Sequence, residues 1–344
     1  MAEIRNYLDS LRCACSDDLP WHLFEGKNIL ITGATGLIGS CLIDILMMRK
    51  HTYTVYAAGR NEERAKAKFC NYFTDDTFHF IHYDVNEPLH AEIPFHYMIH
   101  AASNASPNFF SSDPVGIIKA NIDGVKNLVD YGIHHSLQRF LYVSSGEVYG
   151  EGCNEKWKED DSGYVNCTTL RACYPASKRA AEALSIAYAH QYGIEVVIGR
   201  PCHTYGPGFT ESDNRVYAQF LRNAINHQDI ILKSTGKQYR SWIYVTDCAY
   251  ALLYILLSGQ NLQAYNIADE KSNITLLELA ELISKGTGTK THMELPSKQD
   301  DNATKITKAT FDTTKLMKLG WKAQFNIQSG MQITINTLME PSRD

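Results

Sequence analysis

The sequence predicts an α/β protein built on a doubly wound parallel sheet, followed by a smaller C-terminal lobe. Buried-strand patterns alternate with helical patterns from residue 27 to residue 200. A glycine-rich turn follows the first strand, which is typical of this architecture. With 344 residues and 44% hydrophobic side chains, the chain is long enough to bury a sizeable core.

Six strand patterns and the helical patterns between them support this fold class. Strands that alternate with helices in this way pair in parallel, and ligands of such sheets bind at the carboxyl ends of the strands. We therefore expect site residues in the turns that follow the strands. The expected strands are residues 27–32, 54–60, 78–83, 96–103, 139–145 and 195–200, and the expected helices run from the glycine turn to 48 and over 62–68, 114–131 and 174–192.

The pattern changes at both ends of this alternating region. Residues 1–26 are expected to form a short helix and a turn, an N-terminal extension to which no chemistry is assigned. After residue 201 the elements become short and mixed, with expected helices over 216–226, 248–257 and 276–285 and further short elements over 230–233 and 236–242. The chain therefore divides into an extension (1–26), a first domain (27–200) and a C-terminal lobe (201–344).

Composition excludes several classes of partner and location. A net charge of -5, with no long basic block, argues against nucleic acid or an anionic membrane as the main partner. No signal-peptide pattern or long uncharged apolar segment is present, so the cytoplasm is the expected compartment. The nine cysteines form no paired metal-ligand motif and are expected to be reduced thiols, with no metal site.

The turn after the first strand has the pattern Gly-x-x-Gly-x-x-Gly between a strand and an apolar helix. Glycines let the backbone turn sharply and approach a pyrophosphate, whose charge then lies at the positive N-terminus of the helix. An ordinary strand-to-helix turn is the alternative, but the strand and the helix on either side favour dinucleotide binding. The expected contacts are Gly33, Thr35, Gly36, Leu37, Ile38 and Gly39.

The next strands end in residues that suit the rest of a dinucleotide. The second strand ends in Arg60, where NAD sites usually have an acid. Arg60 could meet a 2′-phosphate or stack on adenine, so the cofactor is left as NAD or NADP; a solvated surface arginine is the alternative. Asp84 could accept a hydrogen bond from the adenine amino group. The further expected cofactor contacts are Arg60, Asp84, Val85, Ala101, Ala102, Ser103, Asn121, Tyr174, Lys178 and Pro201.

Tyr174 and Lys178 are the candidate catalytic pair. Four residues apart, they fall on one face of a helix, so the lysine ammonium can lower the pKa of the phenol and make Tyr174 a general base. A chance pair that only packs is the alternative. Ser145 and Glu147 follow the fifth strand and should face the same crevice, with Ser145 as a hydrogen-bond donor and Glu147 as a base or a residue that orients the ligand.

Together these motifs resemble the extended short-chain dehydrogenase/reductase family, specifically its nucleotide-sugar epimerases, dehydratases and decarboxylases. The resemblance covers roughly residues 27–322. It rests on the glycine turn, His100-Ala101-Ala102, residues 144–150 (Ser-Ser-Gly-Glu-Val-Tyr-Gly), Tyr174-x-x-x-Lys178, Arg200-Pro201, Tyr205-Gly206-Pro207, Arg240-x-x-x-Tyr244-Val245-x-Asp247 and Leu319-Gly320-Trp321.

The resemblance implies a Rossmann domain that binds NAD(P) tightly, a C-terminal lobe that binds a nucleoside-diphosphate sugar, and a homodimer. It also implies oxidation of the sugar at carbon 4 and later reduction, with no net redox change. In this scheme Tyr174 takes the hydroxyl proton, Lys178 lowers the pKa of Tyr174 and holds the nicotinamide ribose, and Ser145 steadies the hydroxyl. The implied sugar-nucleotide contacts are Ser103, Ser145, Gly146, Glu147, His203, Arg215, Arg240 and Lys308.

Within the family, the segment Arg171-Ala172-Cys173-Tyr174 and the glutamate Glu147 look most like UDP-glucuronate decarboxylases. Two departures are Gly146 in the loop and a tail arginine that is replaced in residues 305–312. A 4,6-dehydratase is expected to carry an acid at position 146, whereas a 4-epimerase needs none and remains an alternative. Further alternatives are a non-catalytic NAD(P)-binding protein and an NADPH-dependent carbonyl reductase.

Overall fold

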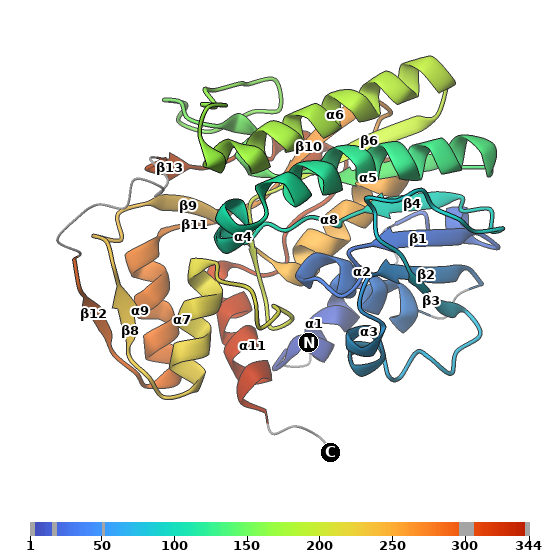
Figure 1. The fold of residues 1–344 in the computed structure, drawn as a ribbon. Coiled ribbons are helices and arrows are strands. Elements are labelled where there is room, and N and C mark those ends of the chain that lie inside the picture. The colour runs from blue at the N-terminus through green and yellow to red at the C-terminus, as the bar shows by residue number, and fades with distance from the viewer. Residues whose placement is uncertain (1–3, 16–18, 50–51, 296–305, 341–344) are drawn as a thin grey trace.

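The computed structural model describes residues 4–15, 19–49, 52–295 and 306–340. A seven-stranded sheet in the order β10-β6-β5-β4-β1-β2-β3, with every neighbouring pair parallel, forms its centre (Figure 1). The predicted doubly wound parallel sheet is thereby confirmed. The strands are β1 (Asn28–Thr32), β2 (Thr54–Gly59), β3 (Phe78–His82), β4 (Tyr97–His100), β5 (Arg139–Val143), β6 (Glu195–Pro201) and β10 (Gln263–Ile267).

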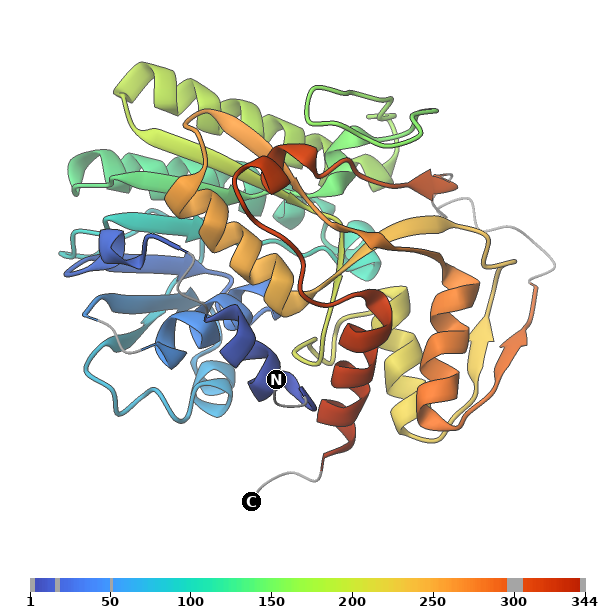
Figure 2. The same ribbon diagram turned by 180° about the vertical axis from the view of Figure 1, so that it is seen from behind.

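Helices cover both faces of this sheet (Figures 1 and 2). Along β1, Ile29 and Ile31 pack into the core shared with α2 and α8, whereas Leu30 packs into the core shared with α5 and α6. A strand that is buried on both faces needs a continuous apolar run, which is why residues 29–31 read Ile-Leu-Ile. The helices of this domain are α2 (Leu37–Met48), α3 (Glu62–Lys68), α4 (Pro107–Ser112), α5 (Pro114–His134), α6 (Cys173–Tyr192) and α8 (Val245–Ser258).

The strand order reverses at β1, whose two neighbours are β2 and β4. The turns after β1 and β4 therefore leave in opposite directions and open a crevice between them, which is the usual ligand site of such sheets. Two one-turn helices follow β5 and precede α6 on the same side, and a third precedes β1. They are η2 (Gly146–Tyr149), η3 (Leu170–Ala172) and η1 (Trp21–Phe24).

The smaller lobe combines two small sheets with a group of helices. In the first sheet β9 pairs with β11, β13 and β7, and in the second β12 pairs with β8. Helix α9 begins with a capping box in which Thr275 and Glu278 exchange hydrogen bonds. The elements are β7 (His203–Tyr205), α7 (Val216–Ile225), β8 (Ile230–Leu232), β9 (Tyr239–Tyr244), β11 (Asp269–Thr275), α9 (Leu276–Thr287), β12 (Thr291–Met293), β13 (Lys308–Ala309), α10 (Thr314–Lys318) and α11 (Ile327–Met339).

Not every element after residue 201 belongs to the smaller lobe. Strand β10 adds to the edge of the large sheet beside β6, and α8 packs against that sheet. The chain thus returns to the first domain after entering the lobe, which the expected boundary at residue 201 did not include. The division into an extension and two domains stays a prediction.

The N-terminal extension contributes helix α1 (Tyr7–Ala14), which lies against α2 and α11. The Tyr7 hydroxyl donates to Asp44 at 2.8 Å and the Tyr7 amide donates to Thr337 at 2.9 Å. Asp17 and Asp18 of the expected turn lie outside the described residues. Within the described ranges, no helix combines the length and the apolar character needed to span a membrane.

Candidate active site

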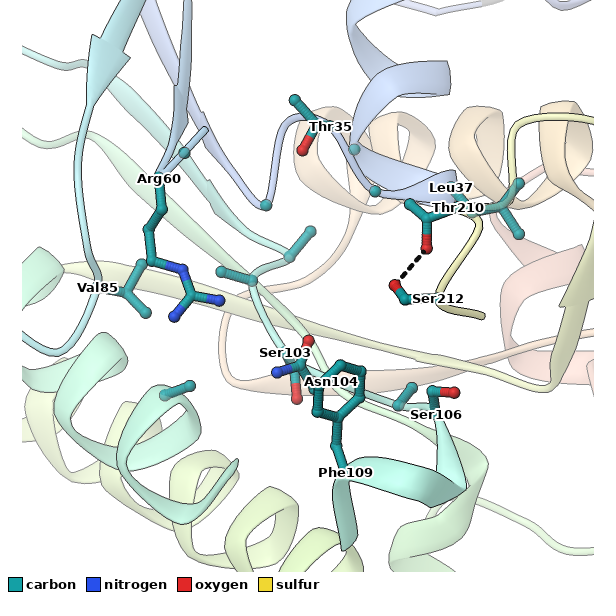
Figure 3. Close-up of a pocket in the computed structure, with 18 of the residues that line it drawn as sticks. Thr35, Leu37, Arg60, Val85, Ser103, Asn104, Ser106, Phe109, Thr210 and Ser212 are labelled. Atoms are coloured by element: carbon teal, nitrogen blue, oxygen red, sulfur yellow. Dashed lines mark hydrogen bonds between the residues drawn. The ribbon is translucent and has the colours of Figure 1, made fainter. Parts of the chain in front are cut away.

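Two adjoining cavities open at the carboxyl ends of the strands. The first, of about 310 Å³, is lined by the glycine turn after β1 and by the ends of β2, β3 and β4 (Figure 3). The second, of about 950 Å³, lies between the large domain and the smaller lobe. Ile38, Ala105 and Arg215 line both cavities, so the two form one continuous space.

The backbone around the first cavity suits a dinucleotide. Gly33 has a φ of +67°, and a Cβ there would lie 2.7 Å from the Ala101 carbonyl, so only glycine fits. No side chain caps the N-terminus of α2, whose amide groups can therefore receive a pyrophosphate. The Ser103 hydroxyl is buried with no hydrogen-bond partner among the described residues. The residues present thus fit the expected cofactor.

Most of the predicted cofactor contacts lie in this cavity. Arg60 and Asp84, at the ends of β2 and β3, form an ion pair of 3.7 Å, and 65% of the Arg60 side chain is exposed. Figure 3 shows the Arg60 side chain beside Val85 at one end of the cavity. The predicted residues that line it are Gly33, Thr35, Gly36, Leu37, Ile38, Gly39, Arg60, Asp84, Val85, Ala101, Ala102 and Ser103.

Four predicted cofactor residues lie elsewhere, and one of them, Tyr174, lines the second cavity. Asn121 is fully buried beneath the site, where it donates to Ile117 and Ser177 and accepts a hydrogen bond from Tyr142. Its face of α5 packs against β5 and α6, which explains why it does not reach the cavity. Pro201 lines the second cavity instead, and Lys178 lines neither cavity.

Tyr174 lies at the start of α6 and faces the second cavity. Only 6% of the residue is exposed; its hydroxyl is hydrogen bonded to Ser145, and its ring stacks on Phe110 with centroids 5.4 Å apart. Burial raises the pKa of Tyr174 to about 12, against the smaller lowering effect of the Ser145 hydrogen bond. Uptake of a proton by Tyr174 therefore needs neighbouring cations that lower this pKa.

Lys178 does not act on Tyr174 as the spacing predicted. Its Nζ donates to the Val143 carbonyl at 2.8 Å and lies 5.7 Å from the centre of the Tyr174 ring. Burial lowers the pKa of Lys178 to about 7, with Glu182 acting in the opposite direction. The expectation of a lowered Tyr174 pKa was thus wrong for this structure, because burial disfavours charge on both side chains.

Ser145, Gly146 and Glu147 meet Tyr174 in the second cavity, as predicted from their place after β5. The Glu147 carboxylate forms a salt bridge with Arg171, in which Oε2 lies 2.7 Å from Nη2 of the guanidinium. A Cβ at Gly146 would overlap the ring of Phe311, a residue that is only 2% exposed. Packing therefore excludes an acidic side chain from position 146.

The smaller lobe brings His203, Arg215 and Arg240 to the same cavity. Burial, followed by the nearby charge of Arg240, lowers the pKa of His203 to about 3, so its imidazole is neutral. Arg215 is held by Asp213, whose carboxylate accepts from Nη2 at 2.6 Å. Lys308 is exposed on β13 and lines neither cavity, because its strand register turns it to the surface.

The second cavity also has lining residues to which the sequence assigned no role in the site, and Arg171 and Trp242 are two of them. Arg171 precedes Tyr174 by three residues, a spacing that could have suggested it. Trp242 is fully buried on β9, and nothing in its sequence context points to a ligand. Four cavity side chains have a buried nitrogen with no hydrogen-bond partner among the described residues, namely Arg171 (Nη1), Arg240 (Nη1), His203 (Nδ1) and Trp242 (Nε1).

The arginine and tryptophan nitrogens of this set suit anionic ligands, since guanidinium groups match phosphate and carboxylate oxygens. The three arginines of this cavity come from α6, α7 and β9 or from the residues just before them. Within the described ranges, no group of three or more His, Cys, Asp or Glu side chains is arranged to hold a metal ion. The site therefore combines a dinucleotide crevice with a larger cavity for an anion.

Comparison with known proteins agrees with this geometry. The model of the NAD dependent epimerase/dehydratase family matches residues 29–268. The chain is 31% identical to UDP-glucuronic acid decarboxylase 2 of Arabidopsis thaliana, over 90% of this chain and 68% of that protein. It is 33% identical to UDP-glucuronic acid decarboxylase 1 of Danio rerio, over 90% of this chain and 72% of that protein.

Solved structures share the fold at lower identity. A UDP-glucose 4-epimerase from Thermotoga maritima, with UDP-glucose, superimposes with a TM-score of 0.76 and 24% identity, over 90% of this chain and 97% of that chain. A dTDP-glucose 4,6-dehydratase from Streptomyces venezuelae, with NAD bound, gives a TM-score of 0.78 and 20% identity, over 90% and 95% of the two chains.

Proposed function

The chain belongs to the NAD dependent epimerase/dehydratase family, and from this premise we propose that it decarboxylates UDP-glucuronate through a transient 4-keto sugar. The continuous space formed by the two cavities supports this function, because it can hold a dinucleotide and a sugar nucleotide end to end. The sugar would lie against Tyr174 and Ser145. The nucleotide and its diphosphate would lie toward Arg240 and His203 in the smaller lobe.

The observation that carries the proposal is that position 146, beside Tyr174, has no room for an acidic side chain, whereas position 147 carries a carboxylate. Elimination of water needs an acid next to the sugar, and Phe311 occupies the space where such a side chain would stand. A carboxylate is present one residue later, where Glu147 is paired with Arg171 at 2.7 Å. Epimerisation of a neutral sugar would give the Glu147–Arg171 pair no role in the reaction. Decarboxylation of an acidic sugar gives the pair a charged group to bind and orient.

The chemistry can be assigned to this chain's own residues. Bound NAD(P)+ supplies a hydride acceptor for carbon 4 of the sugar. Tyr174 exchanges the proton of the carbon-4 hydroxyl, and Ser145 hydrogen bonds the same hydroxyl. Arg215 and Arg171 both lower the pKa of Tyr174 and so favour this exchange. The new 4-keto group accepts the electron pair of the bond between carbons 5 and 6 as carbon dioxide leaves, and carbon 5 then takes up a proton from solvent. Return of the hydride to carbon 4, with the proton held by Tyr174 passing back to the carbon-4 oxygen, would complete the reaction with no net redox change.

A product assay tests the reaction type directly. The purified protein is incubated with UDP-glucuronate, UDP-glucose and dTDP-glucose in separate reactions, and products are followed by mass and by stereochemistry. We expect loss of carbon dioxide from UDP-glucuronate alone. The Tyr174→Phe variant is the control, because it removes only the reactive hydroxyl.

Each other outcome points to a different alternative. A new stereoisomer of unchanged mass identifies an epimerase, and loss of water identifies a dehydratase. Steady consumption of added NADPH with a carbonyl substrate identifies a reductase. Binding of sugar nucleotide with no product in any reaction identifies a non-catalytic protein, and each of these results rejects the proposed decarboxylation.

We propose further that the protein is a homodimer that pairs through α6. Ala180, Ala183 and Ala187 are exposed on one side of this helix, where small side chains permit close approach of a second helix. Ala181 is buried against the chain's own sheet and is not available for this contact. Light scattering coupled to gel filtration checks the proposal, and replacement of Ala183 by Glu should give a monomer.

A cytoplasmic setting is also part of the proposal. All nine cysteines are free thiols, including Cys41 and Cys248, which are buried in the core. Buried thiols that stay reduced fit a reducing compartment. Location of a tagged full-length protein by fluorescence microscopy tests this point.

A further inference from the structure

The proposed substrate carries two anionic parts, a diphosphate and a sugar carboxylate, and each needs a cationic partner in the cavity. The sequence has no arginine between residues 241 and 342, so none can come from the segment around residues 305–312. The arginines that line the second cavity are Arg171, Arg215 and Arg240. One of these three arginines must therefore face the carboxylate at the reacting end of the sugar.

Arg215 and Arg240 are tied to the smaller lobe. Arg215 donates to both carboxylate oxygens of Asp213 and to the Tyr217 hydroxyl, which uses two of its three nitrogens. Arg240 donates from Nη2 to the Ile306 carbonyl at 2.7 Å and lies near His203. These contacts hold both arginines to the smaller lobe, and their charges also act on the catalytic side, Arg215 on Tyr174 and Arg240 beside Glu147.

Arg171 is the arginine of the three that directly contacts Glu147 and the Phe110 ring. Its guanidinium carbon is 4.8 Å from the centre of the Phe110 ring, and that ring stacks directly on Tyr174. Its Nη2 donates to Glu147 at 2.7 Å, while its Nη1 is shielded from water with no partner among the described residues. A guanidinium has five N–H donors, so a single bond to Glu147 leaves most of its capacity unused.

We propose that Arg171 binds the carboxylate of the sugar, with one edge of its guanidinium on that carboxylate and Nη2 still on Glu147. This assignment rests on the proposed function, because it takes the substrate to be an acidic sugar. Arg171 then offsets two negative charges, that of Glu147 and that of the ligand, which would otherwise repel each other in the buried cavity. A neutral sugar would leave the unpartnered nitrogen buried and unsatisfied, so Arg171 also selects for acidic sugars.

Equilibrium binding to the cofactor-loaded protein tests the assignment. All variants carry Tyr174→Phe so that no turnover occurs, and calorimetry measures the Kd of UDP-glucuronate and of UDP-glucose, which lacks the carboxylate. We expect Arg171→Gln to weaken UDP-glucuronate roughly 10- to 100-fold, since hydrogen bonds to charged groups contribute about 1.5–3 kcal/mol. The Kd of UDP-glucose should change less than about twofold.

Two matched variants separate a direct contact from an indirect one. Arg240→Gln should weaken both ligands by similar factors, because both carry the diphosphate. Glu147→Gln keeps Arg171 and removes a repelling charge, so UDP-glucuronate should bind as tightly as before or more tightly. If Glu147→Gln reproduces the selective loss seen with Arg171→Gln, Arg171 acts only by holding Glu147 and the assignment is overturned.

The remaining outcomes are also decisive. If Arg171→Gln weakens the binding of UDP-glucuronate and UDP-glucose equally, or weakens neither, Arg171 does not bind the carboxylate. This conclusion holds even where the wild type decarboxylates UDP-glucuronate. Failure of the wild type in the product assay rejects the proposed function itself, and the assignment with it. If Arg171→Gln does not fold, as judged by thermal melting, Arg171→Lys retains the charge and should show a smaller loss of the same selectivity.

Discussion

The ring of Phe311 fills the space into which a side chain at position 146 would project. Phe311 is fixed there by a buried aromatic cluster, in which it packs on Tyr149 and Tyr149 stacks on Trp157 with centroids 5.2 Å apart. The backbone adds a further restraint, since Trp157 donates to the carbonyl of the residue before Phe311. Gly146 is therefore required by packing, and its place in the site follows from a contact 165 residues away in the chain.

Adding a methyl group at this position should destabilise the protein. We expect Gly146→Ala to lower the free energy of unfolding by about 1–3 kcal/mol, the usual cost of overpacking. In a Phe311→Leu background the same substitution should cost less, because the two positions are in contact. Urea unfolding of the four proteins of this cycle measures the coupling.

The control for this cycle is Gly208→Ala, whose Cβ would make only ordinary contacts at 3.5 Å and beyond. It should stay within about 0.5 kcal/mol of the wild type. Additive costs for positions 146 and 311 would show that Phe311 can move aside. In that case packing would not explain the missing acid.

Tyr174→Phe should abolish the reaction while leaving the ligands bound. Loss of the proton-exchanging hydroxyl is expected to reduce kcat by about 10²–10⁴-fold, the range of general acid–base catalysis. The ring and its stacking on Phe110 remain, so the Kd of UDP-glucuronate should change little. Single-turnover kinetics and calorimetry measure the two quantities, and a variant with unchanged kcat would remove Tyr174 from the mechanism.

Arg60 should affect one cofactor more than the other. Its exposed guanidinium lies at the end of β2, where a 2′-phosphate would add a second anionic partner beside Asp84. We expect Arg60→Ala to raise the Kd of NADP+ by about tenfold and the Kd of NAD+ by less than about twofold, because only the contact with the 2′-phosphate is lost. Calorimetry on cofactor-free protein measures both affinities.

The matched control is Lys66→Ala, since Lys66 is exposed on the same stretch of chain but is paired with Glu62 at 2.8 Å and lines neither cavity. It should alter neither affinity. Equal weakening of NAD+ and NADP+ by Arg60→Ala would instead identify Arg60 as a residue that stacks on adenine.

The large sheet could be predicted because its signals are local. The strands β1, β2, β4 and β5 are short apolar runs, each followed by a helix, and the glycine turn fixes the first crossover. Strand β10 could not be predicted in the same way, because residues 263–267 alternate only weakly and their partner β6 is far away in the chain. The lobe has short strands whose pairing depends on tertiary packing.

The candidate site shows the same division. The rule that ligands bind at the carboxyl ends of strands placed Ser145 and Glu147 correctly beside Tyr174. It does not tell which face of a helix or strand a residue occupies, and Asn121 and Lys308, which were expected as ligand contacts on other grounds, lie outside both cavities. Nor could it reveal the Phe311 contact.

Acid should destabilise the protein through His100. This histidine is buried between β4 and α5, where its Nδ1 lies 2.8 Å from the Thr32 hydroxyl and its Nε2 lies 3.0 Å from the Ala120 carbonyl. The carbonyl can only accept, so Nε2 carries the proton and Nδ1 accepts from Thr32. Burial, with the nearby charge of Lys178, lowers the pKa of His100 to about 3.

The sign of the effect follows from linkage. Between pH 6.5, the ordinary value for histidine, and about pH 3, the unfolded chain binds a proton at this position that the folded chain does not. Stability is therefore lost as the pH falls through this window, by about 1.4 kcal/mol per pH unit. His203, whose pKa is lowered in the same direction, should add a second contribution of this kind.

Replacement of the histidines measures these contributions. His100→Gln should lower the free energy of unfolding at pH 7, because Thr32 and Ala120 lose their hydrogen-bond partner. Between pH 6.5 and 4.5 the free energy of unfolding should fall less steeply with pH than in the wild type, by a slope that corresponds to about one proton. His22→Gln, at an exposed position, is the control and should leave the slope as it is. An unchanged slope in His100→Gln would show that the buried imidazole takes up a proton without cost, and the assigned tautomer and its hydrogen bonds would then be wrong.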